Sequence, residues 1–271
     1  MLILYHHGSS VCAAKVRLAL AEKSLPWEGR YVDILKGEQF TPEFRKLNPK
    51  SVVPVLIDDG RIVTESTVIN EYLEERSPQP SIFPADPFAR AKMRVWTKTV
   101  DEALHPACAA LTFITSHRHT IAKLGPEKMK AFLDSTPTIS VTPTWKAQKR
   151  AFVEQGFDAP GAHEMIRLYD YYMRKADEDL AGGGPWLVGG TFSAADISLI
   201  PYVNRLDMLG LAGLWEGGRL PRLDDWWRRV KARPSFKPQI IDWIPEGLTN
   251  DLRTYGPKSW PEVKRIVGIA A

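Results

Sequence analysis

The sequence has few of the residues that build metal centres or disulfide frameworks. Its 271 residues include only two cysteines, Cys12 and Cys108, and six histidines scattered along the chain. Two cysteines cannot form a disulfide framework, and they suit a reducing compartment such as the cytoplasm. The closely spaced pair His117-Arg-His119 has no cysteine or carboxylate companion nearby. We therefore expect no metal site and a cytoplasmic location.

Long apolar runs and a strong charge of one sign are also missing. No run approaches the roughly 18 apolar residues of a membrane-spanning helix, and the opening MLILYHHGSS lacks the basic and apolar regions of a secretory signal. The net charge is +4, yet the first eighty residues hold ten Lys and Arg against eleven Asp and Glu. The lack of long apolar runs predicts no membrane span. Because neither half carries a basic stripe, we also expect no nucleic-acid partner.

What remains is an ordinary globular composition, with 44% apolar and 25% charged residues, which favours a packed core. The first eighty residues alternate short apolar runs with helical patterns. The runs predict strands at 2–5, 30–34, 53–57 and 61–63, and helices at 11–24, 41–47 and from 65 onward. The expected order is therefore βαβαββα, an α/β domain.

A proline-rich segment ends this pattern. Residues 76–87 carry four prolines, which cannot continue a helix or a central strand. We therefore predict one domain at 1–78, a linker at 79–87, an all-helical domain at 88–245 with an irregular excursion at 114–160, and a C-terminal tail at 246–271. Within the helical domain, helices are expected at 88–113 and 162–181, and from 192 and 223 onward.

Two features of the first domain could bind a peptide-like ligand. Val53-Pro54 precedes an apolar strand. A cis bond there would turn the Val53 peptide outward to pair with an extended peptide, whereas a trans proline at a strand edge would not. Glu65 and Ser66 open a helix whose free backbone N–H groups favour a carboxylate ligand. Ser66 could equally do no more than cap its own helix.

A third feature is Ser9-Ser10 at the start of the first helix. A hydroxyl there can donate to an anion, and a hydrogen bond to a charged group is worth roughly 1.5–3 kcal/mol, so one donor could lower the pKa of a bound thiol by about 1–2 units. A plain N-cap is the alternative. Ser193 and Asp196, by contrast, have the spacing of a capping box, and we interpret them as organising the helical core.

Taken together and in this order, these segments resemble the cytosolic glutathione transferases. The resemblance covers roughly residues 1–236 and depends on YHHGSSVCAAKVRLALAEKSLPWE, DILKGEQFTPEFRKLNPKSVVPVL, TESTVINEYLEE, FSAADI and LPRLDDWWRRVKARPSF. It implies a thioredoxin-like N-terminal domain, an all-helical C-terminal domain and a cis bond before Pro54. It also implies glutathione as the co-substrate, no metal, and a homodimer.

The resemblance assigns roles around the expected thiol. Ser10 aligns with the catalytic serine or cysteine of related classes and is the first choice for activating the glutathione thiol, with Ser9 second. The backbone of Val53 would pair with the cysteinyl unit of glutathione. Glu65 and Ser66 would hold the γ-glutamyl amine and carboxylate, respectively.

Other roles are less directly implied. Val52 stands where many members grip the glycyl carboxylate with a polar side chain, so Lys50, Gln39 or Lys36 would have to replace it. Asp101 could reach the γ-glutamyl group across a dimer. The second-substrate pocket should lie between the domains, bordered by His7, His105 and Trp96, although each histidine could equally be structural.

The resemblance implies a reaction in which the glutathione thiolate attacks an electrophilic carbon of a hydrophobic, aromatic substrate. TESTVINEYLEE and DPFARAKMRVWTKTVDEAL resemble the bacterial β-aryl etherases, so glutathione-dependent ether cleavage is one alternative, and Trp243, Tyr255 and Trp260 could roof an aromatic pocket. A glutathione-dependent thiol-disulfide reductase using Cys12, or a non-catalytic ligand-binding protein, are the others. Because Ser10 occupies the redox position, we expect Cys12 to be a half-buried helix residue.

Overall fold

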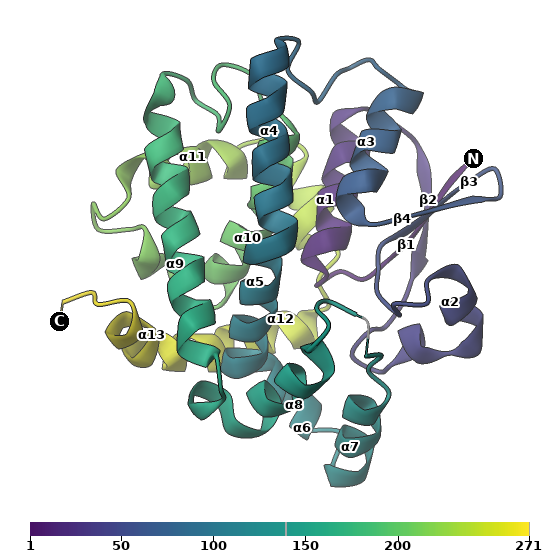
Figure 1. Cartoon of the computed structure of the whole chain (residues 1–271), viewed down its shortest axis with the longest axis vertical. Helices are drawn as coiled ribbons and strands as arrows, with labels where there is room; N and C mark the ends of the chain where they lie inside the picture. Colours follow the sequence, from purple (N-terminus) through teal and green to yellow (C-terminus); the bar gives the residue numbers. More distant parts are fainter. Residues whose placement is uncertain (139, 271) are drawn as a thin grey trace.

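The computed structural model describes residues 1–138 and 140–270, and it places a small sheet beside a larger set of helices (Figure 1). The sheet has the strand order β2-β1-β3-β4. Its strands are β1 (Leu2–His6), β2 (Trp27–Tyr31), β3 (Val55–Asp58) and β4 (Arg61–Thr64). β1 is parallel to β2 and antiparallel to β3, and β4 is antiparallel to β3.

Three helices complete this region: α1 (Val11–Glu22), α2 (Pro42–Leu47) and α3 (Ser66–Arg76). The predicted order βαβαββα and the thioredoxin-like fold are confirmed. α1 forms because its sequence is rich in alanine and leucine, and Ser10 caps it by accepting a hydrogen bond from the Ala13 amide at 3.1 Å. The small side chains of Ala13 and Ala14 are buried.

The predicted second strand is displaced by three residues. It was expected at 30–34, whereas β2 spans 27–31 and pairs Leu2 with Trp27 and His6 with Tyr31. Its residues are only partly buried or exposed, because β2 is an edge strand. The local apolar run therefore did not decide its position, and pairing with β1 did.

The helical region begins with α4 (Pro87–Thr99) and continues almost without interruption through α5 (His105–Thr112), with π-helical turns at 100–104 and 113–117. α9 (Ala162–Asp179), α10 (Ala194–Met208) and α11 (Pro221–Lys231) pack beside it. The capping box is confirmed: the Ser193 amide donates to Asp196 at 3.0 Å, and the indole of Trp226 donates to the same carboxylate at 2.9 Å. The all-helical character of this region is confirmed.

The prediction that residues 114–160 are irregular is wrong, and the expected C-terminal tail is helical. The excursion at 114–160 contains α6 (Arg118–Ala122), α7 (Pro126–Asp134) and α8 (Trp145–Gln155). Its prolines punctuate helices instead of preventing them, since Pro126 occupies a first turn, where proline is tolerated. Residue Ile139, between α7 and α8, lies outside the described residues. The expected tail forms α12 (Glu246–Tyr255) and α13 (Trp260–Ile266), which bury Leu252 and Val263 in the core.

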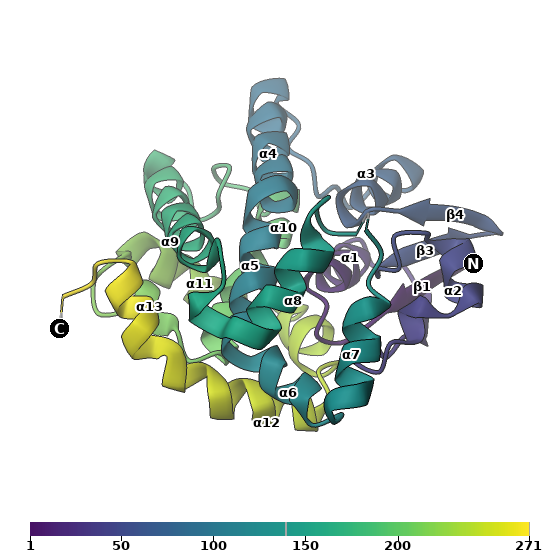
Figure 2. The same cartoon turned by 60° about the horizontal axis from the view of Figure 1, so that its bottom comes forward.

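Figure 2 shows how α7 and α8 bridge the two regions, with α7 lying next to α2. The guanidinium of Arg45 on α2 donates to the Ser135 carbonyl at 3.3 Å, and the rings of Phe40 and Phe132 meet edge to face at 5.7 Å. One apolar core also runs from α1 into α10. The division into two domains at 79–87 stays a prediction. No helix in the described ranges is long and apolar enough to cross a membrane.

Candidate functional site

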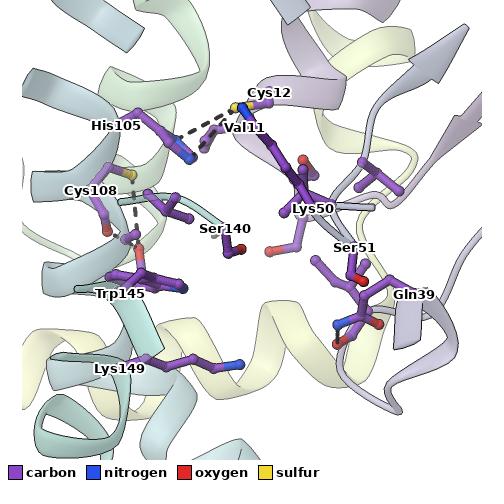
Figure 3. Close-up of a pocket in the computed structure, with 18 of the residues that line it drawn as sticks. Val11, Cys12, Gln39, Lys50, Ser51, His105, Cys108, Ser140, Trp145 and Lys149 are labelled. Carbon is purple, nitrogen blue, oxygen red and sulfur yellow. Dashed lines mark hydrogen bonds between the residues drawn. The ribbon is translucent and has the colours of Figure 1, made fainter. Parts of the chain in front are cut away.

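A cavity of about 270 Å³ lies between the sheet region and the helical region, where α5, α7, α8 and α10 supply lining residues (Figure 3). Most of the site residues predicted from the sequence line this cavity. They are Ser9, Ser10, Gln39, Lys50, Val53, Pro54, Glu65, Ser66, Asp101 and His105. The structure therefore brings together residues that lie almost a hundred positions apart in the chain. It does not by itself assign their roles.

The two serines at the start of α1 face different partners. Ser10 is partly exposed, and its hydroxyl oxygen accepts from the Ala13 amide, which leaves the hydroxyl hydrogen free to donate. Ser9 is buried, and its hydroxyl oxygen accepts from Arg205 at 2.9 Å. Ser10 is therefore the better placed of the two to meet a ligand in the cavity.

The peptide before Pro54 is cis, as predicted. Val53 precedes β3 and lines the cavity. Within the described residues, neither its amide nor its carbonyl pairs with another backbone group. A backbone donor and acceptor are therefore available at this wall, which is what an extended peptide needs in order to pair.

Glu65 and Ser66 begin α3 on the same wall. Glu65 has a left-handed φ of 67°, and its carboxylate accepts from Lys50 Nζ at 2.7 Å. This pair is half-exposed, so solvent screens it. Ser66 is buried as the first residue of α3, where the backbone N–H groups of the first turn lack helical partners. The pair and the helix terminus offer both signs of charge to a zwitterionic ligand.

Gln39 supplies an unpaired acceptor. Its side-chain amide donates to the Ile34 carbonyl at 2.9 Å, while its buried Oε1 has no hydrogen-bond partner among the described residues. Three residues were predicted to bind the glycyl carboxylate in place of Val52, whose side chain is apolar. Lys50 and Gln39 line the cavity, and Lys36 does not. Lys36 is exposed and pairs with Asp33 at 3.0 Å.

These observations fit a tripeptide such as glutathione. Its backbone needs a paired donor and acceptor, which Val53 offers, and its α-amine needs a carboxylate, which Glu65 supplies. Its α-carboxylate needs the N-terminus of a helix, which Ser66 begins. The orphaned Gln39 amide is a further polar group that a bound ligand would satisfy.

Cys12 forms a contact that the sequence did not predict. It is half-buried, as expected, but its sulfur lies 3.6 Å from Nδ1 of His105, whose ring is also 3.2 Å from the Tyr202 hydroxyl. Burial opposes ionisation of the thiol, but the charge and hydrogen bond of His105 outweigh it and lower the pKa of Cys12 to about 7. Burial also disfavours the imidazolium, but the thiolate raises the pKa of His105. The two groups form a candidate thiolate–imidazolium pair.

Asp101 lines the cavity but is engaged within the chain. Its carboxylate accepts from Lys15 Nζ at 2.6 Å, and the same ammonium donates to the Thr67 hydroxyl at 3.1 Å. The Lys15 side chain is fully buried whereas that of Asp101 is 39% exposed. Asp101 thus keeps a solvent-facing oxygen that a second ligand could use.

Two predicted pocket residues lie elsewhere. Trp96 is buried, and its indole donates to Asp179 at 3.0 Å, so it packs among the helices. His7 is 1% exposed, and its Nδ1 accepts from the Ser9 amide at 3.1 Å. Burial lowers the pKa of His7 to about 4. Both placements correct the sequence prediction, because an aromatic or histidine near the right element can still face the core.

The expected aromatic roof is also absent from the cavity lining. Trp243 packs its ring against His6 at 4.6 Å and against Trp27 at 5.8 Å. Trp260 packs close to Gly213, where an added Cβ would lie 2.4 Å from the indole. Tyr255 stacks on His119 at 4.3 Å. Trp243 therefore packs the segment before α12 against the sheet region, while Tyr255 and Trp260 pack α12 and α13 against the other helices.

The opposite wall holds residues that the sequence analysis missed. Lys149 on α8 is 5% exposed and reaches toward the cavity interior in Figure 3. Arg205 on α10 is equally buried, and its Nη1 has no hydrogen-bond partner among the described residues. Lys149 shares a helix face with Trp145 and Phe152. A lysine on an otherwise apolar face was therefore the signal that could have found it. Arg205, the one basic residue of α10, gave a similar signal.

Comparison with known proteins agrees with this geometry. Residues 9–76 match the family model for the glutathione S-transferase N-terminal domain, and residues 172–229 match the model for the C-terminal domain. Protein LigF of Sphingobium is 33% identical over 86% of this chain and 91% of its own length. Its crystal structure, described as a β-etherase, superposes with a TM-score of 0.79 over 88% of this chain and 98% of that one.

Two further relatives are more distant. Glutathione S-transferase TCHQD of Arabidopsis thaliana is 28% identical over 88% of each chain. A probable maleylacetoacetate isomerase of Vibrio cholerae is 28% identical over 87% of this chain and 93% of its own. We conclude that the chain belongs to the glutathione S-transferase family, on the basis of these similarities, the cis peptide at Pro54 and the cavity that the predicted residues line.

Proposed function

We propose that this protein transfers the thiolate of glutathione to an electrophilic carbon of an aromatic substrate. The observation that carries the proposal is the cavity, in which Ser10 and the free Val53 backbone lie on one wall and aromatic rings on the other. Val53 would pair with the cysteinyl unit, and Glu65 and Ser66 would hold the γ-glutamyl end. Gln39 and Lys50 are the candidates for the glycyl carboxylate.

Ser10 would activate the thiol of glutathione by stabilising its thiolate form. Its hydroxyl hydrogen would be donated to the glutathione sulfur, which stabilises the thiolate and releases the thiol proton to solvent. The sulfur then forms a bond to the substrate carbon, and the leaving group departs with its electron pair. Holding both reactants in one cavity supplies the positioning component of the rate.

Ether cleavage is the narrower form of the same reaction. If the leaving group is an aryloxide, thiolate attack on the carbon breaks a C–O bond and yields a glutathione thioether plus a phenol. The likeness to LigF, whose structure is described as a β-etherase, favours this form. The aromatic rings of Phe113, Phe132 and Trp145 line the cavity and suit planar substrates.

The test is an assay of the purified chain with glutathione and two electrophiles, an activated aryl halide and a ketone that carries a β-aryl ether. Mass spectrometry of the products identifies a glutathione thioether in each case, and release of a phenol identifies ether cleavage. Thioether formation supports the proposal. Saturable glutathione binding without any thioether would contradict it and would indicate a ligand-binding protein instead.

A second candidate function is thiol–disulfide exchange at Cys12, favoured by its contact with His105. The Cys12 thiolate would attack one sulfur of glutathione disulfide, forming a mixed disulfide and releasing one glutathione thiolate. Intact mass after incubation with glutathione disulfide measures the adduct. An adduct that the C12S variant loses and that free glutathione removes would favour this activity; no adduct would exclude it.

We also propose that the protein forms a homodimer in the cytoplasm. Val68 on α3 and Phe88 and Val95 on α4 are large apolar side chains that are 54%, 69% and 64% exposed. Such residues on adjacent helices suit a protein interface. Light scattering of the wild type and of an F88S variant tests whether the protein is a dimer. The cytoplasmic location is favoured by the two free thiols, which suit a reducing compartment.

A further inference from the structure

The helical wall of the cavity contains a buried cation that nothing in the proposed reaction uses. Lys149 projects from α8, and Figure 3 shows its side chain extending toward the cavity. The side chain is more than nine-tenths buried, and among the described residues its Nζ donates a hydrogen bond only to the Thr136 hydroxyl, at 3.1 Å. No carboxylate in the ranges 1–138 and 140–270 lies within ion-pair distance of it.

Aromatic rings surround this ammonium. Nζ lies 4.1 Å from the ring centre of Phe132, 5.4 Å from that of Phe113 and 5.8 Å from that of Phe40. Cation–π attraction offsets part of the cost of burying the charge, but rings do not replace a counter-ion. Burial lowers the pKa of Lys149 to about 7, so an anion beside it would favour the charged form near neutral pH.

The neighbouring titratable groups carry no negative charge. His117 lines the same cavity, and its pKa lies well below the usual value because of burial and because of Arg205, His7 and Lys149. Arg205 is itself fully buried, with Nη1 unpaired among the described residues. Of the two carboxylates that line the cavity in the described part of the chain, Glu65 lies on the sheet-side wall and Asp101, on the helical side, is paired with Lys15. The helical wall is therefore positive around Lys149 and Arg205.

The two polar groups at this point are both donors toward the cavity. Nζ donates to the Thr136 oxygen, and the Thr136 hydroxyl hydrogen has no acceptor among the described residues. A carboxylate presents two oxygens side by side and could accept from both, whereas a phenolate or ketone presents one. The surrounding rings are suited to an aromatic body attached to that carboxylate.

We propose that Lys149 and Thr136 bind the carboxylate of an aromatic acid, so that the second substrate is an aromatic carboxylate whose acid group enters first. This rests on the proposed function insofar as the cavity receives the second substrate. The carboxylate pairs with the ammonium of Lys149 and with the Thr136 hydroxyl, and its ring lies among Phe113, Phe132 and Trp145. The electrophilic carbon then points back toward Ser10.

Binding of naphthalene-2-carboxylate and its neutral carboxamide to the full chain, measured by calorimetry without glutathione, tests this site. We expect the wild type to bind the carboxylate at least about tenfold more tightly, since charge-assisted hydrogen bonds are worth roughly 1.5–3 kcal/mol. The K149M variant should lose that preference and keep carboxamide binding. K146M is the matched control, because Lys146 lies on the same helix outside the cavity and donates to the Asp134 carbonyl.

Proton uptake gives a readout that a general loosening of the fold would not reproduce. A carboxylate raises the pKa of Lys149, so calorimetry in buffers of different ionisation enthalpy at pH 7 should show net proton uptake in the wild type and none in K149M. If K149M does not fold, K149Q serves instead. Equal affinity of the wild type for acid and amide, or a preference that survives in K149M, would overturn the proposal.

A second measurement separates this inference from the proposed function. Conjugation of 4-chloro-3-nitrobenzoate and of its amide is compared in the wild type and K149M. We expect kcat/KM for the acid to fall about tenfold or more in K149M, while that for the amide changes little. If neither compound is conjugated but the calorimetric preference for the acid stands, the proposed transfer reaction fails and the carboxylate site remains.

Discussion

The two walls of the cavity recognise ligands by different means. On the sheet-side wall the features are a backbone turn at Val53, a helix start at Ser66 and the hydroxyl of Ser10, each fixed by residues close by in the sequence. On the helical wall they are long side chains, Lys149 and Arg205, whose positions depend on packing between distant helices. The first wall suits one invariant peptide, and the second can vary with the substrate.

Of the predicted effects on the two walls, the largest should come from removing the Ser10 hydroxyl on the sheet-side wall. If this hydroxyl stabilises the thiolate, S10A should lower kcat/KM for aryl halide conjugation about 10- to 100-fold, since one charge-assisted hydrogen bond is worth roughly 1.5–3 kcal/mol. The pKa of bound glutathione, followed by thiolate absorbance, should rise. S9T, a conservative change on the residue that contacts Arg205, is the control. Unchanged kinetics in S10A would mean that the sheet-side wall does not activate the thiol.

The Cys12–His105 pair crosses the boundary between the walls, so its reactivity tests whether they act together. Iodoacetamide labelling should follow the thiolate, with a midpoint near pH 7 set by the Cys12 pKa. Reactivity should therefore rise with pH through 7. Removing the imidazole in H105Q removes the main group that lowers this pKa, so the midpoint should move up by about one unit or more.

Peptide mapping identifies which cysteine is labelled. Cys108 is the internal control, because burial raises the pKa of its thiol and keeps it slow to react. An unshifted labelling profile in H105Q would show that the 3.6 Å contact does not tune the Cys12 thiol.

A smaller effect is expected at the rim of the sheet-side wall. E65Q keeps the shape of Glu65 but removes the charge that would face the γ-glutamyl amine, so KM for glutathione should rise about three- to tenfold with kcat little changed. The fold should be barely affected, since exposed ion pairs contribute about 0–1 kcal/mol and the Lys50–Glu65 pair is half-exposed. Steady-state kinetics and thermal melts measure the two quantities. A loss of kcat with unchanged KM would contradict the binding role.

The smallest effect should come from K50M. It removes the other member of the same pair, and KM for glutathione should rise by no more than about threefold, because Gln39 remains to meet the glycyl end. If K50M weakens glutathione more than E65Q does, the glycyl carboxylate depends on Lys50 and the role given to Gln39 is wrong.

The contrast between the walls also explains what the sequence could predict. The βαβαββα order and the capping box of Ser193 and Asp196 follow from short-range patterns, whereas the cis peptide before Pro54 was implied by the family resemblance. The structure confirms all three. β2 was displaced, because an edge strand is positioned by its partner β1 rather than by its own apolar run.

Predictions that depended on which way a side chain points fared worse. Trp96 lies on a helix near the cavity but faces Asp179. Lys149 belongs to a segment that the proline and threonine content indicated to be irregular, yet it forms α8. Its place in the cavity depends on α7 and α8 reaching α2, a long-range arrangement that no local pattern encodes (Figure 2).

The central claim is that glutathione lies as an extended peptide along Val53 with its sulfur at the start of α1. A crystal structure of the protein soaked with glutathione tests it most directly. We expect paired hydrogen bonds between the cysteinyl backbone of glutathione and Val53, and the glutathione sulfur within hydrogen-bond distance of the Ser10 hydroxyl. A sulfur bonded to or resting on Cys12, or a tripeptide bound away from Val53, would contradict it.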